Sequence, residues 1–182
     1  MKPVLILVRT LDSINEFIGR CVAWLTLAMV LVQVAVVIMR YVFGISVLAM
    51  QESIWYMHSI VFLVAAGYTL LHDGHVRVDV FYGALGPRGK AWIDLFGSVA
   101  ILLPVCFMIW WVSWPYVAAA WRVREGSIEV SGIQAVYLLK TCMLVFAGSL
   151  FLQGISLGIR SALCLTGSDV TAEYEDGGSA GP

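Results

Sequence analysis

The densest polar run of the chain lies near its midpoint, between two pairs of long apolar segments. It reads His72-Asp73-Gly74-His75-Val76-Arg77-Val78-Asp79, and five of its eight side chains can carry charge. His72, His75 and Asp79 are residue types that bind metal ions, but three donors in a short loop do not define a tetrahedral site. We therefore expect no metal or other cofactor. We expect the run to hydrogen-bond helix ends and to hold Arg77 and Asp79 near lipid headgroups or a partner protein.

His58 is the one readily ionisable residue well inside an apolar segment. Such residues usually face protein rather than lipid. We expect a neutral histidine that hydrogen-bonds a neighbouring helix, with a proton relay as the alternative. A haem held by His58 and His72 is excluded within one chain, because 14 residues of helix separate them by about 21 Å.

Four apolar segments must position these residues. The chain has 182 residues, of which 60% are hydrophobic and 13% charged, whereas soluble domains carry about 25% charged residues. A membrane-spanning helix needs about 20 apolar residues. Four uncharged stretches have about this length or more: residues 21–39, 53–71, 95–121 and 141–159. We predict an all-α membrane protein with four transmembrane helices.

Residues 1–20 are predicted to form an amphipathic helix in the membrane interface, before a four-helix domain over residues 21–165. Four apolar residues recur at helical spacing, and polar residues fill the opposite face. The alternative is that this helix extends the first span into water. Residues 166–182 are predicted to be an acidic, disordered cytoplasmic tail. The two faces of the first helix are Leu7, Leu11, Ile14 and Ile18 against Arg9, Asp12, Ser13, Glu16 and Arg20.

The distribution of basic residues predicts that both termini are cytoplasmic. With the N-terminus inside, the inner segments hold seven lysines and arginines and the outer loops hold four, as the positive-inside rule favours. The net charge of −1 offers no basic surface to nucleic acid. The inner set is Lys2, Arg9, Arg20, Arg77, Arg88, Lys90 and Arg160, and the outer set is Arg40, Arg122, Arg124 and Lys140.

The outer side carries the remaining candidate interaction residues. Arg40 follows the first apolar stretch, and Gln51-Glu52 is expected to open the second helix, where the helix dipole favours an acid. Arg40 and Glu52 are expected either to pair within the chain or to contact a partner. An exposed pair contributes only about 0–1 kcal/mol, so stability alone would not explain it. Glu125 lies in the outer loop 122–132, which mixes charge with glycine and can act as a docking edge.

The last two spans carry features of helix packing. Pro104 is expected to kink the third helix. Small residues in the fourth span allow close approach of another helix, and helices of a partner are the simplest explanation for them. Tryptophans crowd the outer end of the third span as an interfacial belt, with a sugar-stacking platform as the alternative. The small residues are Gly148, Ser149, Gly154 and Ser156, and the tryptophans are Trp110, Trp111, Trp114 and Trp121.

These stretches together resemble the small membrane subunit of tripartite ATP-independent periplasmic (TRAP) transporters, the DctQ-like family. The resemblance covers about residues 20–162. Ala49-Met50-Gln51-Glu52 is similar to the mannitol/chloroaromatic-type branch, since the dicarboxylate branch usually shows Trp-x-Glu-Glu there. The matching stretches are residues 40–44, 51–52, 68–79, 91–94, 113–115 and 139–140.

This resemblance implies a non-enzymatic transport subunit of the bacterial inner membrane. A periplasmic substrate-binding protein would capture an organic acid, and a large polytopic subunit would move it with an ion. The small subunit would scaffold the large one within the lipid and help to dock the binding protein. Its spans have almost no polar lining, which argues against a carrier made from this chain alone. A haem- or quinone-associated membrane anchor of a redox complex and a membrane assembly factor are the alternatives.

Overall fold

The computed structural model describes residues 2–72, 74, 82 and 85–166. Within these ranges the chain is helical and has no strand, and four helical stretches are long and apolar enough to cross a membrane. The predicted fold class is therefore confirmed. The stretches are Ile6–Val42, Leu48–Leu71, Pro87–Val123 and Val136–Leu165. The elements are α1 (Lys2–Val42), α2 (Leu48–Ser59), η1 (Ile60–Val64), α3 (Ala66–Leu71), α5 (Pro87–Phe96), η2 (Gly97–Leu102), α6 (Leu103–Val123) and α7 (Val136–Leu165).

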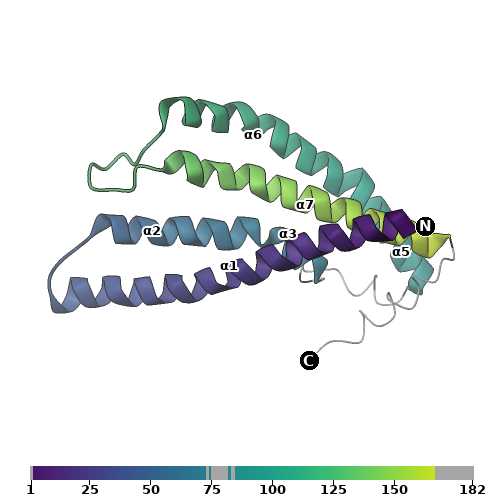
Figure 1. Ribbon diagram of the computed structural model, residues 1–182, viewed down its shortest axis with the longest axis horizontal. Helices are drawn as coiled ribbons and strands as arrows, with labels where there is room; N and C mark the ends of the chain where they lie inside the picture. Colours follow the sequence, from purple (N-terminus) through teal and green to yellow (C-terminus); the bar gives the residue numbers. More distant parts are fainter. Residues whose placement is uncertain (1, 73, 75–81, 83–84, 167–182) are drawn as a thin grey trace.

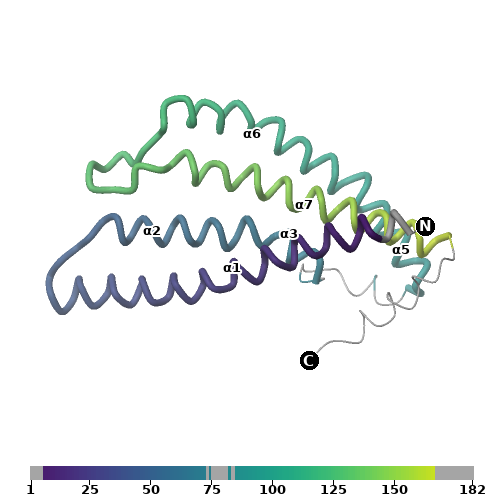
Figure 2. Tube along the Cα trace, viewed as in Figure 1, coloured from purple at the N-terminus to yellow at the C-terminus, as the bar shows by residue number. Residues whose placement is uncertain are grey.

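The last helix, α7, is the centre of the bundle. It packs against α6, α5, α3 and α1, and it lies between α6 and α2 in Figure 1. In its most apolar window 44% of the residues are buried, against 6%, 11% and 11% in the first, second and third spans. The Cα trace in Figure 2 shows the helices converging at the end that holds the N-terminus and separating toward the opposite end. Three of the four spans therefore leave most of their surface to lipid or to partners.

The small residues of α7 serve packing within this chain. The carbonyl of Gly154 accepts a hydrogen bond from Ser98 Oγ at 2.6 Å. A Cβ added at Gly154 would stand 2.9 Å from the Leu102 side chain and 3.2 Å from that of Leu103. The expectation that these residues admit the helices of a partner is wrong, because helices of this chain already meet them: η2 and α6 face Gly154, and Ser156 hydrogen-bonds Asp12 of α1. Helices approach closely where side chains are small, and this contact seats the third span on the fourth.

The first helix continues through Arg20 without a break. Its buried residues are Val8, Leu11, Asn15 and Val22, which lie on one side of the helix, whereas Leu7 and Ile14 are exposed. The residues of the predicted apolar face therefore differ in exposure: Leu11 is buried against the bundle, whereas Leu7 and Ile14 are exposed. The end of the predicted segment at residue 20 does not coincide with a helix end. Its location in the membrane interface stays a prediction.

Two prolines mark the third span: one lies at its start, and the other lies near the junction of η2 and α6. Pro87 is the first residue of α5, where its missing N–H costs nothing. Pro104 is the second residue of α6, which follows the π-helical segment η2. A proline removes the hydrogen bond to the carbonyl four residues earlier, and here that carbonyl belongs to Ala100 inside η2.

Gly19 marks the closest approach between α1 and the second span, and a methyl group there is expected to destabilise the bundle. A Cβ at Gly19 would collide with the Tyr68 ring and stand 2.7 Å from Tyr68 Cβ, so the two helices would have to separate. Gly19→Ala should lower the unfolding free energy by about 1–3 kcal/mol. Thermal unfolding of the detergent-solubilised protein measures this as a lower Tm. Gly97→Ala is the matched control, because nothing lies within 4 Å of a Cβ there. Equal melting temperatures for the two variants would contradict the packing assignment.

Candidate functional site

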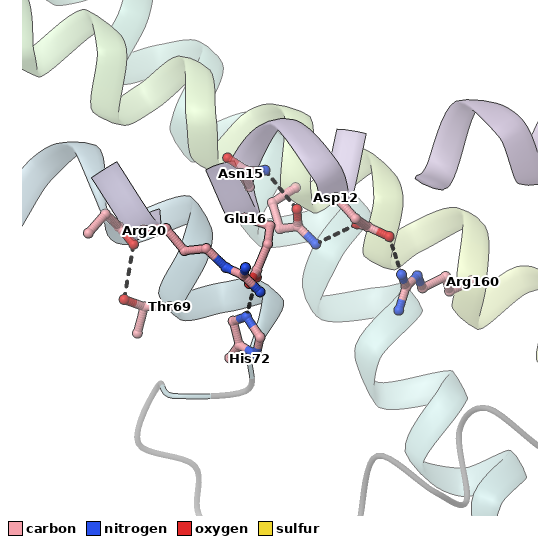
Figure 3. A network of polar contacts seen from close by, with 9 residues as sticks. Asp12, Asn15, Glu16, Arg20, Thr69, His72 and Arg160 are labelled. Carbon is pink, nitrogen blue, oxygen red and sulfur yellow. Dashed lines mark hydrogen bonds and ion pairs between the residues drawn. The ribbon is translucent and has the colours of Figure 1, made fainter. Parts of the chain in front are cut away.

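Polar side chains join α1 to α7 near the N-terminal end of the bundle. Asp12 accepts hydrogen bonds from Gln153 Nε2 at 3.1 Å and from Ser156 Oγ at 2.8 Å, and it forms an ion pair with Arg160. Figure 3 shows Asp12 and Arg160 facing each other. Asn15, 2% exposed, donates from Nδ2 to Gln153 Oε1 at 2.7 Å. The carboxylate and the amides thus satisfy one another's hydrogen-bonding groups.

These contacts were not predicted from the sequence, which placed Asp12 on a water-facing side of the first helix. The signal was nevertheless present in the spacing. Asp12 and Asn15 are three residues apart, and Gln153, Ser156 and Arg160 follow one another at three and four residues. Such spacing puts polar residues on one face of each helix. What the spacing could not show is that the two faces meet.

His72 connects the end of the second span to α1. Its Nε2 lies 2.6 Å from Glu16 Oε2, and Glu16 Oε1 accepts a hydrogen bond from Arg20 Nε at 2.7 Å. Figure 3 shows Glu16 between His72 and Arg20. The His72 ring also contacts the Tyr68 ring, with centroids 4.4 Å apart. The structure thus places His72 at the end of the second span and against the middle of α1. The expected bonding of helix ends by the polar run stays a prediction.

The rest of the polar run is outside the part of the chain that the structure describes. This holds for Asp73, His75, Arg77 and Asp79. The contacts of these four residues with lipid or a partner stay predictions. Gly74 is described, and its amide donates to the Thr69 carbonyl at 2.8 Å, a bond that closes the end of α3. Among the described residues, no group of three or more His, Cys, Asp or Glu side chains could hold a metal ion.

Glu52 fixes the loop between α6 and α7 at the opposite end of the bundle. Its Oε1 accepts a hydrogen bond from Ser127 Oγ at 2.6 Å, and its Oε2 accepts one from the Ile133 amide at 2.6 Å. Ser127 Oγ in turn accepts from the Glu129 amide at 3.2 Å. A Cβ on Gly132 would stand 2.6 Å from both carboxylate oxygens, so the loop backbone lies directly against the acid. Glu52 is only 9% exposed.

The predicted roles of Glu52 and Arg40 within the chain are wrong in two respects. The helix α2 begins at Leu48, so Glu52 lies beyond its first turn and does not cap it. The carboxylate is bound by the loop, and Arg40 has no ion-pair partner among the residues the structure describes. Arg40 is exposed in the last turn of α1. Gln51 makes only a 3.4 Å hydrogen bond from Nε2 to Ser46 Oγ. Contact of Arg40 and Gln51 with a partner stays a prediction.

Glu125 and Lys140 hold the two ends of the same loop together. Lys140 Nζ lies 2.5 Å from Glu125 Oε2 and 4.0 Å from the centroid of the Tyr116 ring. Nearby, Trp121 Nε1 donates to Thr141 Oγ1 at 2.9 Å, which joins the ends of α6 and α7. The candidate residue Glu125 therefore shapes the loop from its base. Trp121 hydrogen-bonds within the chain, while Trp111 and Trp114 are exposed as an interfacial belt requires.

Two apolar side chains at the tip of this anchored loop are fully exposed. Ile128 and Val130 have relative exposures of 101% and 99%. Branched apolar side chains in a held loop give a rigid, desolvated contact to a partner at little entropic cost. We call residues 127–131 the loop tip. The residues described at this end of the bundle position one another and the loop backbone.

A comparison with protein families gives one match. The model of the DctQ component of tripartite ATP-independent periplasmic transporters matches residues 29–163, well over half of the 182 residues. No curated protein and no solved structure matches the chain. The matched range includes Glu52, the loop tip and most of α7.

Removal of the Glu52 carboxylate should release the loop. Hydrogen bonds to a charged group contribute about 1.5–3 kcal/mol each, so Glu52→Ala should speed hydrogen exchange at the Ile133 amide by at least about tenfold. Exchange of the purified protein in nanodiscs, read by mass spectrometry over the loop peptide, measures this. Gln51→Ala is the control, since its single 3.4 Å bond ends on Ser46 and not on the loop. Unchanged protection in Glu52→Ala would contradict the anchoring role.

Proposed function

Because this chain belongs to the DctQ component family of tripartite ATP-independent periplasmic transporters, we propose that it scaffolds the large membrane subunit and helps to dock the substrate-binding protein. A member of this family is a small membrane subunit of a transporter and not an enzyme. The family works with a large membrane subunit and a substrate-binding protein, and four membrane-spanning helices suit a multi-pass protein of the inner membrane.

The observation that carries the docking role is the anchored outer loop. A buried carboxylate in the second span holds a loop from the other half of the chain, and that loop exposes Ile128 and Val130 to water. The stability of the fold gives no reason for these two apolar side chains to be exposed. Exposed apolar groups on a rigid frame are typical of protein interaction sites. With seven basic residues on the inner side and four on the outer, this loop faces the periplasm and both termini face the cytoplasm.

The scaffold role is supported by how little the first three spans bury inside this chain. Only 6% of the most apolar window of α1 is covered. The hydrogen bonds of Asp12 and Glu52 hold the helices at both ends, and the small face of α7 is filled by the chain itself. The bundle is therefore a static support with much free helical surface. The moving parts and the substrate path belong to the large subunit.

We assign the chain to a system for ion-coupled uptake of an organic acid, as the proposed class of transporter implies. The Ala49-Met50-Gln51-Glu52 sequence favours the mannitol/chloroaromatic-type branch over the dicarboxylate branch. The substrate itself is selected by the binding protein and the large subunit, because the described spans of this chain offer no enclosed polar site.

Uptake should require this chain together with its partners. Proteoliposomes that hold the large subunit and this chain, supplied with the binding protein loaded with a radiolabelled organic acid, should accumulate the acid when an ion gradient is imposed. Vesicles with either membrane subunit alone should accumulate none above background, because one lacks the support and the other lacks a substrate path. Accumulation by this chain alone, or full uptake without it, would overturn the proposed function.

The loop tip should set the affinity for the binding protein. Replacing Ile128 and Val130 together by serine removes two fully exposed apolar contacts. Each is worth about 1–2 kcal/mol if buried at a partner, so half-maximal uptake should need at least about tenfold more binding protein. Co-purification with the large subunit should be unchanged. Ser131→Ala on the same tip is the control. An unchanged concentration dependence in the Ile128/Val130 variant would remove the loop tip from the docking surface.

A further inference from the structure

A groove lies between α1 and α2, toward the end of the bundle where the helices separate. It is open to the surface and has a volume of about 390 Å³. Its walls are mostly apolar, and they include Val30 and Val34 from α1 and Trp55 from α2. Gln33 and His58 are the two polar residues among those that line it. One comes from each wall, which places a polar residue of each helix beside the same groove.

Both polar residues lie within the hydrocarbon layer. Gln33 is seven residues before Arg40, and His58 is six residues after Glu52. At a rise of about 1.5 Å per residue, both lie roughly 10 Å inside the outer charged boundary. A hydrocarbon core of about 30 Å places them well away from water and headgroups.

Neither side chain is satisfied by this chain. Among the described residues, Gln33 and His58 have no side-chain hydrogen bond, and both are exposed on the outside of the helices. The His58 ring stacks only on Phe62, with centroids 6.1 Å apart. The sequence predicted that His58 bonds a neighbouring helix, and the described part of the chain provides none. An amide and an imidazole that face acyl chains without partners are costly, so the covering surface must be polar at this depth.

We infer that the groove receives a transmembrane helix of the large membrane subunit, and that a polar side chain or free carbonyl of that helix hydrogen-bonds Gln33 and His58. This rests on the proposed function, which supplies the partner. Acyl chains cannot form these bonds. Polar residues that pair across helices are a common source of association within lipid.

A helix fits the site better than a small ligand does. The volume alone does not decide, because small molecules are bound in cavities of about 300–1,000 Å³. The groove, however, continues into a long exposed apolar surface on the same helix, as a helix–helix contact requires. The exposed residues of α1 along this length are Leu27, Val30, Leu31, Val34, Val37 and Ile38.

Photo-crosslinking within the assembled complex tests which molecule occupies the groove. Trp55 in the groove and Trp111 on α6 are similarly exposed, at 68% and 71%. Each is replaced in turn by p-benzoylphenylalanine in the chain co-expressed with the large subunit. Irradiation should join the large subunit to position 55 and not to position 111. Adducts at position 55 only with phospholipid, with quinone or with a second copy of this chain would overturn the inference.

Substitution of the polar pair tests the hydrogen bonds. Gln33→Leu and His58→Leu should each weaken association with the large subunit about 3- to 15-fold, since interhelical hydrogen bonds in membranes contribute about 0.6–1.7 kcal/mol. Dissociation of fluorescently labelled subunits on dilution measures this. Leucine is more apolar than either residue, so insertion of the chain should not suffer. His58→Asn keeps a donor and an acceptor and should restore much of the affinity. Wild-type affinity in both leucine variants would overturn the inference.

The two proposals fail in different ways. If uptake needs this chain and the wild-type subunits co-purify, but position 55 gives no adduct with the large subunit, only the groove assignment falls. If the wild-type chain neither co-purifies with the large subunit nor supports uptake, the proposed function falls, and the groove assignment falls with it.

Discussion

Polar groups that lie among apolar helices must find partners in the protein, because lipid offers none, and the bundle is built around that requirement. At the N-terminal end of the bundle the Asp12 carboxylate binds Gln153, Ser156 and Arg160 and so joins the first helix to the last. At the opposite end the Glu52 carboxylate binds the loop that joins α6 and α7. Each acid connects halves of the chain that are far apart in sequence. These two sets of contacts hold the bundle together near its two ends, with apolar helices between them.

The position of α7 decides which surfaces remain free. Its small residues accept η2 and α6 at close range, and its polar residues accept α1. The helix is therefore the most buried of the four spans, while the other three turn most of their side chains outward. In the outer half α1 and α2 leave a groove that contains Gln33 and His58. With its buried surface around α7 and its exposed surface on the other spans, the subunit is stabilised by contacts inside its own chain. The exposed helices remain available to a partner protein, as the proposed scaffold role requires.

The sequence and the structure agree on what depends on local composition. The four spans follow from runs of uncharged residues. The predictions from sequence were wrong where they concerned which residue or helix a given residue contacts. Glu52 was expected at a helix end, either paired with Arg40 or in contact with a partner, but it binds a loop about 80 residues away. Gly154 was assigned to a foreign helix, but it packs on Leu102 and Leu103. Spacing identifies the face on which a residue lies and not the surface that meets that face.

The sequence by itself determined the number of spans, the helical class and the likeness to a transporter subunit, because hydrophobic length and short motifs are properties of contiguous residues. Tertiary structure alone decided that Asp12 is joined to Arg160, that Glu52 holds Ser127 and Ile133, and that His58 is left facing outward. Helices of similar apolarity can pack in many orders, and apolarity does not discriminate among them. Complementary hydrogen-bonding groups and the fit of side chains select one order, and both are defined only when distant segments are brought together.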